Sequence, residues 1–131
     1  MILGIGTDIV YIQRVRESLA KHGDSFAQRI LTEKEFKIFK SKNESIQAAF
    51  LAKRFAAKEA TAKAMGTGFS QGLSLRHIGV ENDEAGKPSL YYLESAKKFV
   101  AENKVTQSHI SLSDEKEYAV AYVILVTMMV T

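Results

Sequence analysis

The sequence predicts an α+β fold, with helices in the first half of the chain and antiparallel strands in the second. Residues 44–65 are rich in alanine, contain neither glycine nor proline, and are followed by Gly66, which suits a long helix with a glycine C-cap. Residues 78–82 and 89–93 have the composition of strands and flank a turn sequence at 83–88. Helices followed by a hairpin favour α+β over an alternating α/β arrangement.

The remaining elements follow in chain order. Residues 1–10 are rich in Ile, Leu and Val, which predicts a buried strand. Residues 11–21 place their apolar side chains at helical spacing, which predicts an amphipathic helix. Thr32 and Glu35 have the spacing of a capping box, which predicts the start of another helix. We further expect a short helix at 25–30, a helix at 94–103, and strands at 105–112 and 118–130.

The composition is that of a folded globular chain. Its 131 residues suffice for one domain and are too few for two independent cores, and 46% of them are hydrophobic and 25% charged. The absence of cysteine excludes disulfides, zinc–thiolate sites and thiol nucleophiles. The longest apolar stretch, 118–130, is shorter than the roughly 20 residues of a membrane helix, and the N-terminus has no secretory signal. We therefore expect a cytoplasmic protein.

Basic charge is concentrated in the N-terminal half, although the whole chain has a formal net charge of only +3. Residues 1–66 hold 12 Lys and Arg against 7 Asp and Glu, a net of +5. Residues 67–131 hold 6 against 8, a net of −2. This asymmetry predicts an acidic partner, which could be a nucleic acid, a phosphate compound or an acidic protein.

Asp8 places a carboxylate in the first, otherwise apolar, predicted strand. An ionised carboxylate is unfavourable in apolar surroundings unless a cation or hydrogen bonds compensate it. Asp8 could cap the helix that follows, or it could ligate a metal ion. The preceding Gly4-x-Gly6 is not a dinucleotide-binding motif, because Ile9 stands where the third glycine would be required.

A second candidate lies on the long predicted helix. Glu59 and Lys63 are four residues apart and share one helix face, where they could form an ordinary surface ion pair. Arg54 and Lys58 add two cations, and the helix runs into Gly66-Thr67-Gly68, whose backbone N–H groups could face phosphate oxygens. A carboxylate among cations beside a glycine loop predicts a magnesium–diphosphate site.

A third candidate is the predicted strand that carries His109, Ser111 and Ser113 on one face. These side chains could form an ordinary polar surface. They could equally contact a phosphate or a nucleotide.

Together these segments resemble the holo-[acyl-carrier-protein] synthases, the short, single-domain group of 4′-phosphopantetheinyl transferases. The resemblance rests on Gly6-Thr7-Asp8-Ile9-Val10 and on Arg54-Phe55-Ala56-Ala57-Lys58-Glu59-Ala60 with Lys63 and Gly66-Thr67-Gly68. Arg29-Ile30-Leu31-Thr32, Gly86-Lys87-Pro88 and Glu117-Tyr118-Ala119 follow in the family's order. The resemblance covers essentially all of residues 1–131. It implies a single domain of the 4′-phosphopantetheinyl transferase-like fold, in which an antiparallel sheet packs against a long central helix.

The resemblance implies a group transfer. The 4′-phosphopantetheine arm of coenzyme A would pass to a serine hydroxyl of apo-acyl carrier protein, releasing adenosine 3′,5′-bisphosphate and supporting fatty acid biosynthesis. Asp8 and Glu59 would hold Mg²⁺ on the diphosphate, and Lys63 would stabilise its developing charge. Glu59, directly or through a water on the metal, would accept the serine proton.

The resemblance also implies binding contacts. Val10 stands where larger relatives often carry a second acidic residue, and water would replace that ligand. Asp114 stands where many relatives carry histidine, which leaves His109 as the candidate contact of the coenzyme A 3′-phosphate. The residues expected to bind coenzyme A are Arg54, Lys58, Lys63, Gly66, Gly68, Lys87, Pro88 and His109.

Acyl carrier protein is acidic, so the resemblance assigns the basic half of the chain to its docking. Arg14, Phe26 and Arg29 would bind it, whereas Arg16 and Lys21 would be merely solvated. Members of this size assemble as homotrimers with coenzyme A between subunits. The strand at 118–130 could supply part of that interface.

Two other classes of function fit the sequence less well. A small nucleic-acid-binding module needs cations interleaved with exposed aromatics, but Phe36 and Phe39 have the spacing of a helix that buries them. A non-catalytic scaffold would leave the combination of Asp8, Glu59 and Lys63 unexplained. We expect neither a nucleic acid nor a membrane as a partner.

Overall fold

The computed structural model describes residues 1–129, and their fold is the predicted α+β class. In chain order the elements are β1 (Ile2–Tyr11), α1 (Ile12–His22), α2 (Asp24–Ile30), α3 (Glu33–Ser41), α4 (Glu44–Met65), the 3₁₀ turn η1 (Leu75–His77), β2 (Ile78–Asn82), β3 (Pro88–Tyr92), α5 (Glu94–Glu102), β4 (Val105–Asp114) and β5 (Tyr118–Thr127). Every predicted element is confirmed to within about two residues, except the end of the last strand. The prediction that the first strand is buried was wrong for one face, because β1 exposes Ile5 and Ile9.

The predicted strand 118–130 ends early. β5 stops at Thr127, whose single hydroxyl proton is shared between the backbone oxygens of Asn103 (2.6 Å) and Lys104 (3.1 Å) and thereby ties the strand to the end of α5. Val130, the last residue of the prediction, lies outside the described residues. β4 runs two residues further than expected, because its antiparallel ladder with β5 continues to Asp114.

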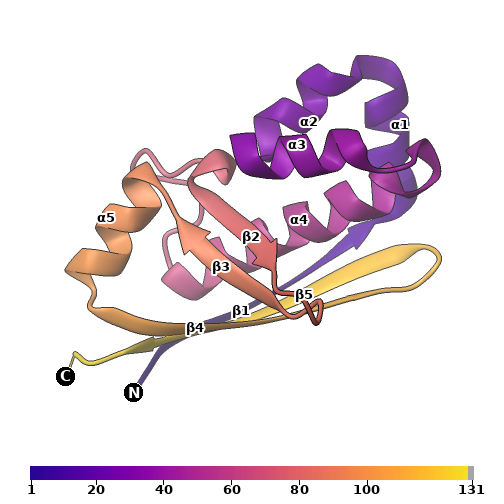
Figure 1. The fold of residues 1–131 in the computed structure, drawn as a ribbon. Helices are drawn as coiled ribbons and strands as arrows, with labels where there is room; N and C mark the ends of the chain where they lie inside the picture. Colours follow the sequence, from indigo (N-terminus) through magenta and orange to yellow (C-terminus); the bar gives the residue numbers. More distant parts are fainter. Residues whose placement is uncertain (130–131) are drawn as a thin grey trace.

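The strands form two antiparallel sheets, and both are visible in Figure 1. The larger has the order β1-β5-β4, and the smaller is the β2–β3 hairpin. Helix α4 lies across β1 and β5, and α1 to α3 gather around its N-terminal half (Figure 1). The hydrophobic core fills the space between α4 and the large sheet, where β5 contributes Ala119, Ala121, Val123 and Leu125. No helix within residues 1–129 is long and apolar enough to cross a membrane.

Two glycines allow β1 to lie unusually close to α4. A Cβ at Gly4 would overlap the backbone oxygen of Ala64, and a Cβ at Gly6 would overlap that of Ala60. The alanines of α4 leave its backbone uncovered on this side, so glycine and alanine together bring strand and helix into contact. Gly4 and Gly6 therefore allow β1, the strand that carries Asp8, to pack directly against α4.

Local signals set the ends of the helices. Thr32 and Glu35 form the predicted capping box at the start of α3, and Gly66 closes α4 in the left-handed conformation with a φ of 81°. Both confirm the predictions made from the sequence.

Candidate functional site

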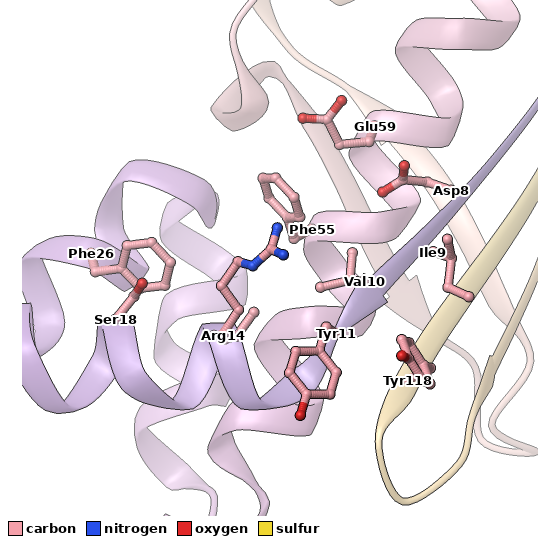
Figure 2. Close-up of a pocket in the computed structure, with 11 residues that line it drawn as sticks. Asp8, Ile9, Val10, Tyr11, Arg14, Ser18, Phe26, Phe55, Glu59 and Tyr118 are labelled. Atoms are coloured by element: carbon pink, nitrogen blue, oxygen red, sulfur yellow. The ribbon is translucent and has the colours of Figure 1, made fainter.

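Asp8 and Glu59 line one cavity of about 610 Å³, which we call the carboxylate cavity. Asp8 projects from the inner face of β1 and its side chain is 17% exposed, whereas Glu59 projects from the middle of α4. Figure 2 shows both carboxylates on one side of the cavity, with Phe55 beside them and Arg14 and Phe26 across from them. The two candidate ligands come from separate elements, and the close β1–α4 contact brings them together.

The charges of this cavity are only partly balanced. The ammonium of Lys63 lies 3.1 Å from Asp8 Oδ1 and donates a further hydrogen bond to the backbone oxygen of Thr7 at 3.0 Å. The alternative of an ordinary Glu59–Lys63 surface pair does not hold, because this pair is not among the ion pairs of residues 1–129. Burial raises the pKa of Glu59 above its ordinary 4.5, Asp8 raises it further, and Lys63 lowers it. The two carboxylates thus lie close together, with Lys63 paired to Asp8 and the guanidinium of Arg14 in the cavity lining.

This donor set suits a hard divalent cation. Carboxylate oxygens are the protein ligands that Mg²⁺ prefers, and a second cation would relieve the repulsion that raises the pKa of Glu59. Residues 1–129 contain no cluster of three or more His, Cys, Asp or Glu placed to hold a metal ion. Val10, which stands where larger relatives often carry a second acidic residue, is a buried apolar side chain in the lining of the same cavity. Two carboxylates leave most coordination positions to water and to the oxygens of a ligand.

Arg14 and Phe26, predicted to bind a partner, line the same cavity as the two carboxylates. In Figure 2 the guanidinium of Arg14 points from α1 toward Phe55. Arg29 is exposed in the last turn of α2, the helix that also carries Phe26. A basic and aromatic rim therefore borders the carboxylates.

Sequence reasoning gave no site role to several other lining residues of this cavity, among them Ser18, Phe55 and Tyr118. Phe55 lies one helical turn before Glu59, so its spacing alone could have placed it on the same face. Ser18 and Tyr118 come from α1 and β5 and carry no local signal of their own. Only the folded chain brings them to the carboxylates.

The structure corrects the expected role of Lys58. Its side chain is 0% exposed, and its ammonium donates to Glu35 Oε1 at 2.6 Å and to the backbone oxygens of Leu75 and Ile78. An ammonium has three protons, and all three are occupied. Burial lowers the pKa of Lys58, and the carboxylate of Glu35 opposes that shift. Lys58 therefore fastens α4 to α3, η1 and β2 and has no donor left for a phosphate.

Arg54 also lies away from Glu59, in a second cavity of about 310 Å³ that we call the cationic cavity. Its lining comprises Ile38, Lys42, Phe50, Lys53, Arg54 and Asn82. Three cations and no carboxylate make this cavity suitable for an anion. Lys42, Lys53 and Asn82 were not predicted, because each is an ordinary polar residue until the hairpin folds beside α4.

The other predicted ligand contacts are distributed over the surface. Gly66 and Gly68 both have positive φ, 81° and 58°, in the loop after α4. Lys87 and Pro88 lie where the β2–β3 turn enters β3, and His109 is exposed on β4 opposite Ile124. Neither these residues nor Arg54 line the carboxylate cavity. Within residues 1–129 of a single chain, these predicted coenzyme A contacts therefore lie apart from the two carboxylates.

Asp114, whose role the sequence left open, ends β4 beside α4. Its Oδ1 lies 3.3 Å from the ammonium of Lys53, and both side chains are about one-third exposed. Asp114 thus faces a cation of the cationic cavity.

Comparison with known proteins gives consistent matches over nearly the whole chain. The family model described as the 4′-phosphopantetheinyl transferase superfamily matches residues 4–123. A curated holo-[acyl-carrier-protein] synthase of Halorhodospira halophila is 52% identical over 97% of this chain and 99% of its own length. A holo-[acyl-carrier-protein] synthase from Neisseria meningitidis, known from a crystal structure, is 42% identical in sequence. Its structure matches with a TM-score of 0.89 over 97% of this chain and 100% of the Neisseria chain. A Bacillus anthracis synthase in complex with coenzyme A (3′,5′-ADP) is 41% identical, with a TM-score of 0.82 over 97% and 98% of the two chains.

Proposed function

This chain belongs to the 4′-phosphopantetheinyl transferase superfamily, and we propose that its carboxylate cavity is where phosphopantetheine is transferred to a carrier protein. The enzyme is a holo-[acyl-carrier-protein] synthase, which moves the 4′-phosphopantetheine of coenzyme A to a serine of apo-acyl carrier protein. The observation that carries the proposal is the meeting of Asp8 and Glu59 in one cavity beside Arg14. Cytoplasmic fatty acid biosynthesis is the proposed setting.

In the reaction, the serine oxygen forms a bond to the phosphorus that bears pantetheine. The bond from that phosphorus to the bridging oxygen breaks, and adenosine 3′,5′-bisphosphate leaves. Asp8 and Glu59 would hold Mg²⁺, which when bound would neutralise the diphosphate and make its phosphorus more electrophilic. Lys63, which reaches Asp8 in the free chain, supplies positive charge to the leaving phosphate. Glu59 accepts the serine proton, directly or through water, since burial and the nearby Asp8 raise the pKa of its carboxyl above the ordinary value.

The nucleotide end of coenzyme A binds at the cationic cavity under this proposal. Arg54 supplies a buried guanidinium there, and Lys87 and Pro88 belong to the adjoining hairpin turn. His109 stays the proposed contact of the 3′-phosphate. Gly66 and Gly68 are proposed to present backbone N–H groups to the diphosphate.

A homotrimer would unite the two cavities. The carboxylate cavity and the residues proposed for the nucleotide are separate in one chain, so a site shared between neighbouring copies accounts for both. The outer face of the large sheet supports such assembly, because it exposes large apolar side chains, namely Ile5, Ile9, Tyr11, Tyr118, Val120 and Tyr122. The strand β5, the middle strand of that sheet, would then lie at the contact between copies.

The test of this function is a mass measurement. Purified protein, coenzyme A, Mg²⁺ and apo-acyl carrier protein should yield carrier protein heavier by one phosphopantetheine. Asp8→Ala and Glu59→Ala should each reduce the rate by at least about a hundredfold, because each removes a carboxylate from the reacting centre. Glu102→Ala, which removes an exposed carboxylate of α5, serves as the matched control and should react normally. Absence of the mass shift with the folded wild-type enzyme would refute the proposal.

The carrier protein docks on the basic rim formed by Arg14, Phe26 and Arg29. Arg14→Glu and Arg29→Glu should each raise the carrier-protein KM about tenfold or more while changing the coenzyme A KM little, because charge reversal repels an acidic partner. Arg16→Glu is the control on α1, the helix of Arg14. Arg16 donates a surface hydrogen bond to Gln13 Oε1 and does not line the carboxylate cavity. Equal changes in both KM values would argue against docking at this rim.

A further inference from the structure

Asn82 joins two parts of the molecule that are proposed to bind the nucleotide. Its Oδ1 accepts a hydrogen bond of 2.9 Å from Arg54 Nη2, and its Nδ2 donates one of 2.9 Å to the backbone oxygen of Gly86. Asn82 is the last residue of β2 and pairs across the hairpin with Pro88. One amide therefore links the guanidinium on α4 to the turn that carries Lys87.

Arg54 depends on this amide for its orientation. Its side chain is only 6% exposed, and its guanidinium lies over the ring of Phe50 at 4.5 Å. Within residues 1–129 the guanidinium donates a single hydrogen bond, the one to Asn82, and its buried Nε has no hydrogen-bond partner. Because only Nη2 donates a hydrogen bond, a guanidinium that lines a cavity with three cations and no carboxylate among its lining residues is suited to bind an anion.

A competing carboxylate lies on the other side of the guanidinium. Glu35 Oε2 is 3.7 Å from Arg54 Nε, too far for a hydrogen bond. Glu35 is itself fully buried and already accepts from Lys58, from Thr32 N and from Val80 N. Without the Asn82 acceptor, electrostatic attraction would draw the guanidinium toward Glu35 and away from the cavity.

We infer that Asn82 is a positioning residue for nucleotide binding: it holds Arg54 away from Glu35 and fixes the adjoining turn, so that the cationic cavity is preformed for a phosphate group. The inference rests on the proposed function, because it assigns this cavity to the nucleotide end of coenzyme A. Asn82 acts through Arg54 and need not touch the substrate.

Isothermal titration calorimetry with adenosine 3′,5′-bisphosphate, on the wild-type protein and its variants, tests the inference. Asn82→Ala should weaken binding about tenfold, the usual effect of losing a hydrogen bond to a charged group. The KM for coenzyme A should rise similarly, while kcat at saturating coenzyme A and the carrier-protein KM stay within about twofold. Glu81→Gln is the matched control, because Glu81 is the preceding residue of β2 and its side chain pairs with Lys34 instead. It should bind the bisphosphate like wild type.

A double-mutant cycle separates positioning through Arg54 from a direct contact. In an Arg54→Gln background, Asn82→Ala should cause no further loss of affinity. Unchanged affinity of the single variant, or an additive loss in the double variant, would overturn the inference while leaving the proposed function intact. Wild-type protein that binds no bisphosphate would instead contradict the proposed function, and the inference with it. A fall in kcat and a rise in both KM values, together with a lowered melting temperature, would indicate a folding defect and also reject the positioning role.

Discussion

At the scale of single residues, Glu59 is subject to opposing electrostatic effects. Burial and the nearby Asp8 raise the pKa of its carboxyl, and Lys63 only partly compensates. A proton and a divalent cation are the two species that can relieve this excess of negative charge. They therefore compete for the same carboxylate.

This competition predicts how metal binding depends on pH. Because the pKa of Glu59 is above 4.5, its carboxyl is still protonated at pH values where an exposed glutamate has ionised, and the protonated form is a poor ligand. Affinity for Mn²⁺, used as a probe for Mg²⁺, should fall as the pH is lowered, with a midpoint above 4.5. Titration calorimetry across this range checks the expectation. Glu59→Gln should bind weakly without that midpoint, and a wild-type midpoint at or below 4.5 would contradict the assignment.

The sequence shows the type of each charge but not its surroundings. Lys58 and Lys63 lie in the same alanine-rich segment, and both were expected at the diphosphate. Lys58 is instead enclosed by Glu35, Leu75 and Ile78, which come from three other segments of the chain. Since no local spacing connects these partners, the burial of Lys58 could be learned only from the folded chain.

At the scale of elements, the contact between β1 and α4 determines the position of the candidate metal ligands. Asp8 lies two residues after Gly6 and Glu59 one residue before Ala60, the two positions where strand and helix backbones approach most closely. Any separation of the two elements would also separate the two carboxylates. Packing and the chemistry of the site are thus linked through one small contact.

Gly6→Ala tests this link. Its added methyl would overlap the backbone oxygen of Ala60, which no side-chain movement can relieve, so the free energy of unfolding should fall by at least about 2 kcal/mol. The Mn²⁺ affinity of the folded fraction should fall as well. Ser89→Thr, at an exposed position of β3 outside the large sheet, should change stability by less than about 0.5 kcal/mol. Chemical denaturation measures the first quantity, and a Gly6→Ala protein of wild-type stability would show that the close approach is not required.

Element boundaries were predictable because their signals are local. Gly66 ends α4 and the Thr32–Glu35 capping box starts α3 where the sequence indicates. The cationic cavity was not predictable, because Lys42, Lys53 and Asn82 come together only when the β2–β3 hairpin packs beside α4. Family resemblance identified Asp8 and Glu59 as a pair, and the β1–α4 contact supplies the physical reason that they meet.

At the scale of the whole molecule, the outer face of the large sheet is the main surface without a covering layer (Figure 1). Tyr122 lies in its middle strand between Thr7 of β1 and Ser111 of β4, and its side chain is 44% exposed. Ile5 and Ile9 flank it on β1 and are more than half exposed. Apolar side chains gathered on one face are typical of a contact between copies.

Subunit complementation tests whether neighbouring copies share one active site. Asp8→Ala lacks a metal ligand and Arg54→Gln lacks a nucleotide contact, so each variant alone should be nearly inactive. If a site takes Asp8 from one copy and Arg54 from its neighbour, unfolding and refolding an equal mixture should make about a quarter of the sites intact, and activity should return to about that fraction of wild type. Adding Tyr122→Glu to both variants should yield monomers by sedimentation and abolish the recovery, because it places a charge on the apolar contact face. Lys97→Glu, an exposed change on α5, is the control that should leave recovery intact. A mixture no more active than its parents, despite mixed assembly, would place each complete site within a single chain.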